Sequence, residues 1–227
     1  MFRIKICGVT RVEDVRQIVQ AGADAIGLNF YPASPRSIDL DEASRIVCEI
    51  PAGIDRVGVF VNASEATIRR AHNRLSLDAI QLHGDEPPHT VSQLHDLPVI
   101  RAFRCRDEPF TAIRDYLDQC GQLGVLPKAV LIDAYSAQAY GGTGETVAWQ
   151  RLADTRDQFG DVPLVLAGGL SPVNVGSAIT LVRPQAVDTA SGVEASPGTK
   201  DARLVDQFVV QARAAFARVD SDRPSGP

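Results

Sequence analysis

Two side chains that can exchange protons stand at the ends of short apolar segments. Cys7 closes the segment RIKIC, and Asp133 closes the segment AVLID. A thiol needs its pKa lowered from about 8.5 to act as a base near neutral pH, and a carboxyl group needs its pKa raised from about 3.9 to act as an acid. The residue types alone leave simpler roles open. Most free cysteines are buried structural thiols, and a strand-end aspartate commonly caps the loop that follows it.

Two glycine-bearing turns could hold an anion. The segment AGGLSPVN carries Gly168 and Gly169, and the segment DTASGVE carries Ala190, Ser191 and Gly192. Both turns can present free backbone amides, and the first leads into an expected helix start. Amides and the positive end of a helix dipole together bind phosphate, so the two turns indicate a phosphate site.

Short β-branched segments alternate with longer amphipathic segments along the whole sequence, which predicts strands alternating with helices. The expected strands are 3–8, 24–30, 55–61, 78–84, 98–104, 129–134, 163–169 and 185–190.

Eight such units without a break in composition are typical of a single (β/α)₈ barrel, the TIM barrel of the α/β class. We considered an open doubly wound sheet as the alternative. That fold usually has a glycine-rich turn of the GxGxxG type after its first strand, and here the turn is Gly8-Val9-Thr10. We therefore expect one barrel domain, residues 1–218, followed by a flexible tail, residues 219–227.

Several residues carry the signatures of helix starts, in which a side chain accepts a hydrogen bond from a free amide. We expect such starts at the pairs Thr10 with Glu13 and Asp39 with Glu42, at Ser171-Pro172, and at Thr199 before the last helix.

The ends of the strands gather polar residues. In a barrel the active site is built there, and alternate residues of a strand share one side. Lys5 and Cys7 therefore lie on one side, Gln81 and His83 on another strand do the same, and Ile4 and Ile6 can pack outward against helices. Strand ends also provide the polar residues Arg101, Asp133 and Asp188.

Composition limits the classes of partner. The formal charge of −5 argues against nucleic acid and anionic membranes but is compatible with a small phosphorylated substrate. No apolar run is long enough to cross a bilayer, and the first ten residues lack the pattern of a signal peptide. The four cysteines (Cys7, Cys48, Cys105, Cys120) are far apart, which favours a reducing compartment, so we expect a cytoplasmic protein. The histidines form no HxH or HExxH pattern, and we expect no metal.

Seven segments carry a resemblance to a known family. They are KICGVT, FYPASPRSI, QLHG, LIDA, GGTGETVAW, LAGGLSPVNV and VDTASGVE, which occur in order between residues 5 and 194. The sequence resembles the phosphoribosylanthranilate isomerases of tryptophan biosynthesis. LAGGL and GVE are shared by many phosphate-binding barrels, whereas KICG together with SPR and GGTG is more specific.

The resemblance implies an Amadori rearrangement by an aldose–ketose isomerase, which is an intramolecular oxidoreductase. An aminoaldose phosphate, N-(5-phosphoribosyl)anthranilate, becomes 1-(2-carboxyphenylamino)-1-deoxyribulose 5-phosphate, the third step of tryptophan synthesis from chorismate. In this family Cys7 corresponds to the general base and Asp133 to the general acid. The reaction requires no cofactor. The resemblance leaves the oligomeric state open between monomer and homodimer.

The resemblance also assigns residues to the substrate. Arg36 in SPR would meet the anthranilate carboxylate, although a solvent-exposed loop arginine is the simpler interpretation. Gln81, His83 and Asp188 would line the inner wall, with His83 neutral. Ala190 stands where the family usually has the first of two serines, so a hydroxyl contact is lost there while the amides remain. Gly142, Thr143 and Gly144 would form a loop that closes over the substrate.

Lys5 has two alternative roles. It lies roughly 6–7 Å from Cys7 along the strand, so its ammonium group could favour the thiolate. Alternatively, Lys5 pairs with a carboxylate such as Asp188 and only closes the floor of the barrel.

Three other functions were considered. The related isomerase of histidine biosynthesis characteristically has aspartate at the position of Cys7. The indole-forming synthase is longer at its N-terminus and uses lysines and glutamates that are not found here. A non-catalytic phosphate-binding barrel would have no need of both Cys7 and Asp133.

Overall fold

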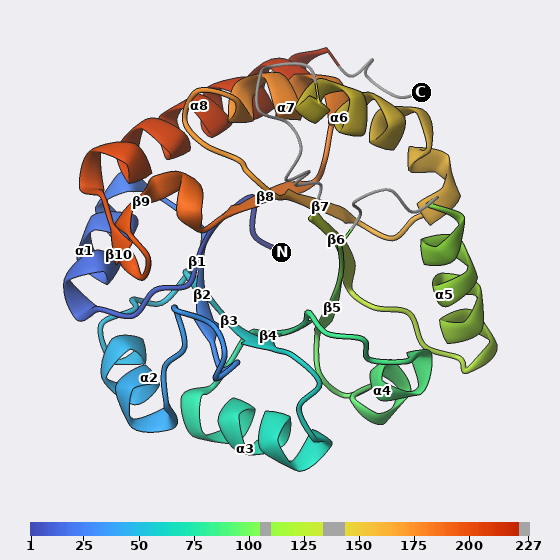
Figure 1. Cartoon of the computed structure of the whole chain (residues 1–227), viewed down its shortest axis with the longest axis horizontal. Helices are drawn as coiled ribbons and strands as arrows, with labels where there is room; N and C mark the ends of the chain where they lie inside the picture. The colour runs from blue at the N-terminus through green and yellow to red at the C-terminus, as the bar shows by residue number, and fades with distance from the viewer. Residues whose placement is uncertain (105–109, 134–143, 223–227) are drawn as a thin grey trace.

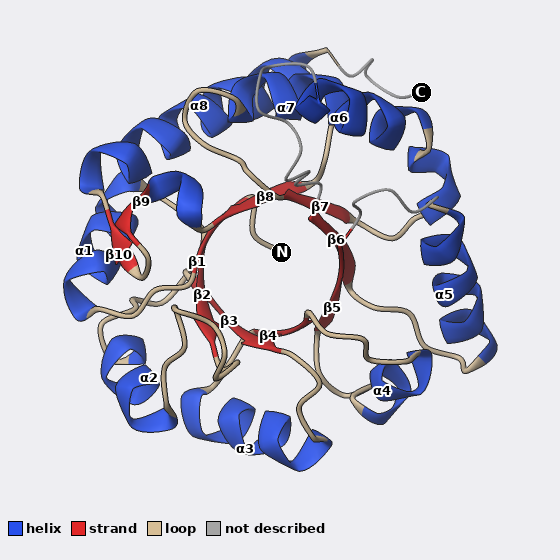
Figure 2. Ribbon diagram, viewed as in Figure 1, coloured by secondary structure: helices blue, strands red, loops and turns tan. Residues whose placement is uncertain are grey.

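Eight parallel strands form a closed barrel in sequence order, and helices surround it (Figure 1). The computed structural model describes residues 1–104, 110–133 and 144–222, the side chains of 144–148 aside. Figure 2 shows the ring of strands inside the ring of helices. The predicted TIM barrel is confirmed.

The predicted strands agree with the observed ones to within about two residues at each end. The strands are β1 (Ile4–Cys7), β2 (Ala25–Asn29), β3 (Asp55–Phe60), β4 (Ala79–Leu82), β5 (Val99–Arg104), β6 (Ala129–Asp133), β7 (Leu164–Ala167) and β8 (Ala186–Thr189). A short hairpin of β9 (Glu194–Ser196) and β10 (Thr199–Lys200) follows β8 and was not predicted.

The described helices alternate with the barrel strands. They are α1 (Val12–Ala21), α2 (Leu40–Val47), α3 (Glu65–Leu75), α4 (Pro88–Gln93), α5 (Thr111–Gln122), α6 (Gly144–Asp154), α7 (Val175–Val182) and α8 (Ala202–Ser221), with 3₁₀ turns at η1 (Arg156–Phe159) and η2 (Ser191–Val193). Helix α8 continues past the predicted domain boundary at residue 218, and Val219 is buried within it.

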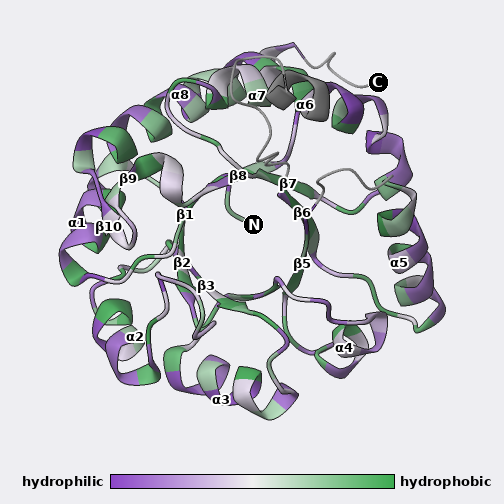
Figure 3. Ribbon diagram, in the orientation of Figure 1, coloured by the Kyte–Doolittle hydropathy of each residue, from purple (hydrophilic) through white to green (hydrophobic). Residues whose placement is uncertain are grey.

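Apolar side chains form two layers because successive residues of a strand face opposite sides. The outer layer, between strands and helices, includes Ile4 and Ile6 as predicted. A smaller cluster fills the barrel interior and includes Phe2, near the N-terminus that Figure 1 places inside the ring. Figure 3 shows hydrophobic and hydrophilic residues alternating along the surrounding helices, as expected when one face of each helix is buried.

One predicted helix start is confirmed and three are wrong. Asp39 and Glu42 form the predicted reciprocal cap of α2. The Thr10 hydroxyl instead donates to the carbonyl of Gly198, 2.6 Å away, so it does not cap α1. Helix α7 begins at Val175, because residues 172–174 form a turn after Ser171. Thr199 belongs to β10, and Asp201 caps α8 through its carboxylate.

Candidate active site

A pocket of about 400 Å³ opens where the barrel strands end, a volume typical of small-molecule sites. Its lining includes most of the predicted site residues: Cys7, Asp133, Arg36, Gln81, His83, Asp188, Gly168, Gly169, Ala190 and Ser191. Gly192 lies beside the pocket and does not line it. Gly142 and Thr143 fall outside the described residues, and Gly144 is the first residue of α6. The structure thus brings these residues together, while their roles stay predictions.

A fully buried ammonium group lies under the pocket. Lys5 Nζ donates to Asp188 Oδ2 at 2.8 Å and to Gln81 Oε1 at 3.0 Å. Burial is the largest single influence and opposes the charge on Lys5, but Asp188 and Cys7 together outweigh it, and the pKa of Lys5 is raised above its ordinary value. Lys5 therefore remains protonated at neutral pH. The pairing of Lys5 with Asp188 is one of the two roles considered from the sequence.

The Cys7 thiol interacts with this ammonium group. Burial raises the pKa of Cys7, and Lys5 and Lys200 lower it without cancelling the effect of burial. Lys5 thus acts on Cys7 in the predicted direction, in addition to pairing with Asp188. Space around the sulfur is limited, because a Cβ added at Gly27 would lie 2.6 Å from Cys7 Sγ. The neighbouring strand β2 therefore needs glycine at this position.

His83 connects the buried network to Asp133. His83 Nδ1 lies 3.0 Å from Gln81 Nε2, and His83 Nε2 lies 3.9 Å from Asp133 Oδ2. Burial, together with Arg104 and Lys5, lowers the pKa of His83 to about 4. The imidazole is therefore neutral at neutral pH, as the sequence predicted.

Arg36 has a carboxylate partner that the sequence analysis did not foresee. Its Nε and Nη2 donate to the two oxygens of Glu194 at 2.8 and 2.6 Å. Glu194 also accepts from Lys200 Nζ at 2.8 Å. Burial alone would raise the pKa of Glu194, but the bonds from Arg36 and Lys200 hold the pKa below its ordinary value. Glu194 thus fixes the Arg36 side chain, which is only 21% exposed, so the alternative of a solvent-exposed loop arginine is wrong.

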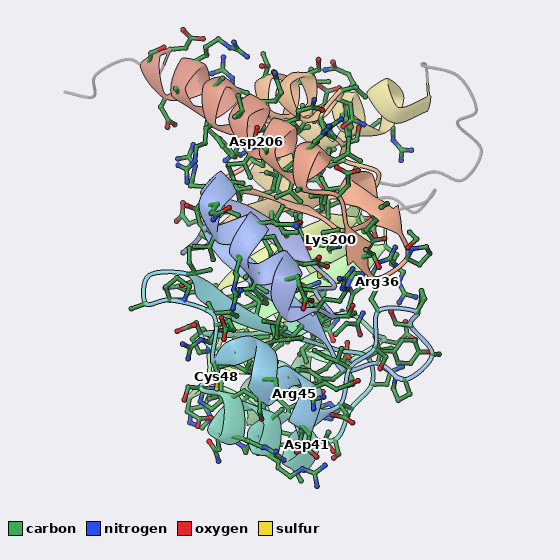
Figure 4. The ribbon with its side chains drawn as sticks, turned by 90° about the vertical axis from the view of Figure 1, so that its left-hand side faces the viewer. Arg36, Asp41, Arg45, Cys48, Lys200 and Asp206 are labelled. Carbon is green, nitrogen blue, oxygen red and sulfur yellow. The ribbon has the colours of Figure 1, made fainter. Side chains whose placement is uncertain are left out.

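Glu194 and Lys200, which hold Arg36 in place, both belong to the hairpin β9–β10. Figure 4 shows Arg36 and Lys200 near each other at mid-height, toward the right-hand side of the view. Lys200 Nζ also donates to the carbonyl oxygens of Cys7, at 2.6 Å, and Ala190, at 3.1 Å. Lys200 therefore ties the end of β1 to the turn after β8. Glu194 lies in the motif VDTASGVE, but nothing in that motif indicates which arginine it meets.

The two predicted phosphate turns pack against each other. Gly168 and Gly169 have φ angles of +91° and +64°, which side-chain-bearing residues rarely adopt. Thr189 Oγ1 donates to the carbonyl of Leu170 at 2.6 Å, and a Cβ at Gly192 would lie only 1.9 Å from that same oxygen. Glycine is therefore required at position 192 for the turns to meet.

The assignment of Arg101 to the strand-end site is wrong. The inner side of β5 carries Ile100 and Ala102, so Arg101 faces outward. It is buried there, donates to the carbonyls of Leu82 and Gly84, and lies 3.3 Å from Glu86. The next inward position belongs to Arg104, which lines the pocket and was missed. Strand alternation places Arg101 and Arg104 on opposite sides of β5, but it does not tell which of the two sides faces inward.

The described residues contain no group of three or more His, Cys, Asp and Glu side chains able to hold a metal ion. Cys7, Cys48 and Cys120 are free thiols. No helix within the described part of the chain is long and apolar enough to cross a membrane.

The fold and the pocket define a (β/α)₈ barrel with its site at the C-terminal ends of the strands. The sequence model of the family described as N-(5'phosphoribosyl)anthranilate (PRA) isomerase matches residues 4–211. The chain therefore belongs to the N-(5'-phosphoribosyl)anthranilate isomerase family, and it is an isomerase.

Relatives match over nearly their whole length. The isomerase of Geobacter sulfurreducens is 44% identical over 214 residues, covering 94% of this chain and 99% of the relative. That of Pseudomonas syringae is 43% identical over 209 residues, covering 91% and 95%. The crystal structure of phosphoribosyl anthranilate isomerase from Thermotoga maritima is 40% identical, covers 94% of this chain and 100% of its own, and superposes with a TM-score of 0.82.

The two buried charges should shift the Cys7 pKa in opposite directions. Lys5→Met removes the cation that stabilises the thiolate, so the pKa of Cys7 should rise further. Asp188→Asn removes an anion that opposes the thiolate, so the pKa should fall. The measurement is the pH dependence of Cys7 alkylation by iodoacetamide, followed by peptide mass spectrometry on variants whose circular dichroism matches the parent. An unchanged pKa in both variants would contradict the electrostatic account of Cys7.

Proposed function

We propose that the pocket converts N-(5-phosphoribosyl)anthranilate to 1-(2-carboxyphenylamino)-1-deoxyribulose 5-phosphate by an Amadori rearrangement, the third step of tryptophan synthesis from chorismate. The observation that carries the proposal is that Cys7, Asp133, Arg36 and the two glycine turns line one pocket. A related structure, 38% identical with a TM-score of 0.79, is a phosphoribosyl anthranilate isomerase in complex with reduced 1-(o-carboxyphenylamino)-1-deoxyribulose 5-phosphate.

The two anionic ends of the substrate fix its direction in the pocket. The phosphate lies against the amides of Gly169 and of residues 190–192. The anthranilate carboxylate meets the free edge of the Arg36 guanidinium, whose Nε edge is occupied by Glu194. The ribose then lies between these two ends, beside Cys7 and Asp133.

The reaction needs two proton transfers of opposite kind. Protonated Asp133 gives its proton to the ring oxygen of the furanose, and the C1–O bond breaks to leave a protonated Schiff base. The Cys7 thiolate then removes the proton from C2, and its electron pair moves to form an enolamine that tautomerises to the ketone. The product is an isomer of the substrate, so no oxidant, reductant or cofactor takes part.

Asp188 provides a position for a ribose hydroxyl group. Its Oδ2 accepts from Lys5, whereas its buried Oδ1 has no hydrogen-bond partner among the described residues. A buried carboxylate oxygen without a donor is unfavourable, and an O–H group of the substrate would satisfy it. Asp188 thus contributes to substrate binding through Oδ1 while it holds Lys5 through Oδ2.

The proposed function is compatible with a cytoplasmic enzyme that acts on a small molecule. The free thiols fit a reducing compartment such as the cytoplasm. The substrate is a small phosphorylated molecule, and the protein needs no nucleic acid or membrane for the reaction. A monomer or a homodimer would serve. One related structure describes monomers generated from the dimeric isomerase of Thermotoga maritima.

Purified protein should consume N-(5-phosphoribosyl)anthranilate, with loss of the substrate's fluorescence. Cys7→Ala and Asp133→Asn should each lower kcat by about 10²–10⁴-fold, because each removes one of the two proton-transferring groups. The matched control is Cys48→Ala. Cys48 is an exposed thiol that follows the last residue of α2 and does not line the pocket (Figure 4). Full activity in either pocket variant would contradict the mechanism, and an inactive parent would contradict the function.

Glu194→Gln should raise the KM for this substrate by roughly 10–100-fold, since charged hydrogen bonds that hold Arg36 are weakened by about 1.5–3 kcal/mol. The value of kcat should change much less, because Glu194 does not touch the reacting atoms. Glu49→Gln is the control, because Glu49 pairs with Arg16 on the surface. An unchanged KM in folded Glu194→Gln protein would show that Arg36 needs no partner.

A further inference from the structure

A network of polar side chains crosses the barrel interior from β8 to β6. Asp188 on β8 holds Lys5 on β1 at 2.8 Å, and Lys5 holds Gln81 on β4 at 3.0 Å. Gln81 lies 3.0 Å from His83, and His83 lies 3.9 Å from Asp133 at the end of β6. Lys5 and Gln81 are fully buried, so water does not compete for these bonds.

The network has only one consistent arrangement of protons. A lysine ammonium group has donors and no acceptor, so the Gln81 atom facing it must be the carbonyl oxygen. The amide nitrogen of Gln81 is then the atom that faces His83. Because that nitrogen donates, His83 Nδ1 must accept, and it carries no proton.

The neutral imidazole must therefore carry its proton on Nε2, the nitrogen that faces Asp133. A doubly protonated imidazole would place an N–H of its own against the amide N–H of Gln81. The pKa of His83, lowered to about 4, agrees with this exclusion. Lys5, held by Asp188, thus determines through Gln81 the tautomer of His83, which directly follows the end of β4.

We propose that Lys5 and Gln81 are positioning residues that fix His83 as its Nε2–H tautomer, so that His83 donates to Asp133 Oδ2 and confines the acidic proton to Oδ1. The proposal rests on the proposed function of Asp133 as the general acid. The present separation of His83 Nε2 and Asp133 Oδ2, 3.9 Å, is longer than a hydrogen bond, so the proposal requires these two atoms to approach each other when the substrate is bound.

The confinement matters because a carboxyl group has two oxygens that can each carry the proton. A donor directed at Oδ2 repels a proton on that oxygen, so the proton resides on Oδ1 and can be directed at the furanose ring oxygen. The opposite tautomer would present a lone pair at Nε2. That lone pair would accept the proton of Asp133 and withdraw it from the substrate.

The structure offers an isosteric change that reverses the tautomer. In Gln81→Glu, a carboxylate accepts from Lys5 on one side and from His83 on the other, which requires a proton on Nδ1. Nitrogen-15 NMR of the histidine-labelled protein reports the protonated ring nitrogen directly. We expect Nε2–H in the parent and Nδ1–H in Gln81→Glu, with the His83 signal assigned by its loss in His83→Gln. Nδ1–H in the parent, or no change in Gln81→Glu, would overturn the proposal.

The kcat of the isomerase reaction provides a second test of the proposal. Gln81→Glu should lower kcat by about 10²-fold, the lower limit of what general acid catalysis contributes. His83→Gln places an amide N–H near the position of Nε2 and has no tautomer to reverse. The double variant Gln81→Glu/His83→Gln should therefore regain part of the kcat lost in Gln81→Glu. A further multiplicative loss in the double variant would overturn the proposal and indicate a purely structural role.

Controls separate this proposal from the proposed function. The exposed Gln93 receives the same change, and Gln93→Glu should alter neither the spectrum nor kcat. The tautomer is read without any turnover, so it tests the network even in an inactive protein. A protein with the expected spectra but no isomerase activity in the parent would contradict the proposed function and leave the tautomer assignment standing.

Discussion

The buried charge of Lys5 is the constraint on which the site depends. An unpaired charge inside a barrel costs several kcal/mol, so the fold must supply a partner. It does so through strand register, because Lys5 and Asp188 are direct neighbours in the pairing of β1 with β8. The barrel closes at this pairing, so the strand contact that closes the fold also brings the ammonium group to its counter-charge.

A second group of charges organises the rim in a similar way. Glu194 and Lys200 come from the hairpin after β8, and they hold Arg36, which comes from the loop after β2. Lys200 also binds the carbonyl of Cys7. Lys200 thus holds the backbone of Cys7, and the positive charges of Lys5 and Lys200 both act to lower the pKa of the thiol. Burial still dominates its pKa.

The sequence was informative where the physics is local. Alternating β-branched segments predicted the eight barrel strands, and the pattern of β1 predicted that Lys5 and Cys7 share the inner side. The predictions failed where distant residues compete. Thr10 makes its bond to Gly198, 188 positions away, in preference to capping α1. Arg36 meets Glu194, 158 positions away, and no local pattern specifies that pair. Arg101 was misplaced because the inward side of β5 depends on its register with neighbouring strands.

The central claim is that Lys5, paired with Asp188, orients the Gln81 amide and thereby fixes the proton of His83 on Nε2. Neutron diffraction from crystals of the deuterated protein tests it most directly, because deuterons are located individually. The account predicts three deuterons on Lys5 Nζ, an amide ND₂ group facing His83, and a single deuteron on the imidazole at Nε2. A deuteron on His83 Nδ1, or a neutral amine at Lys5, would contradict it.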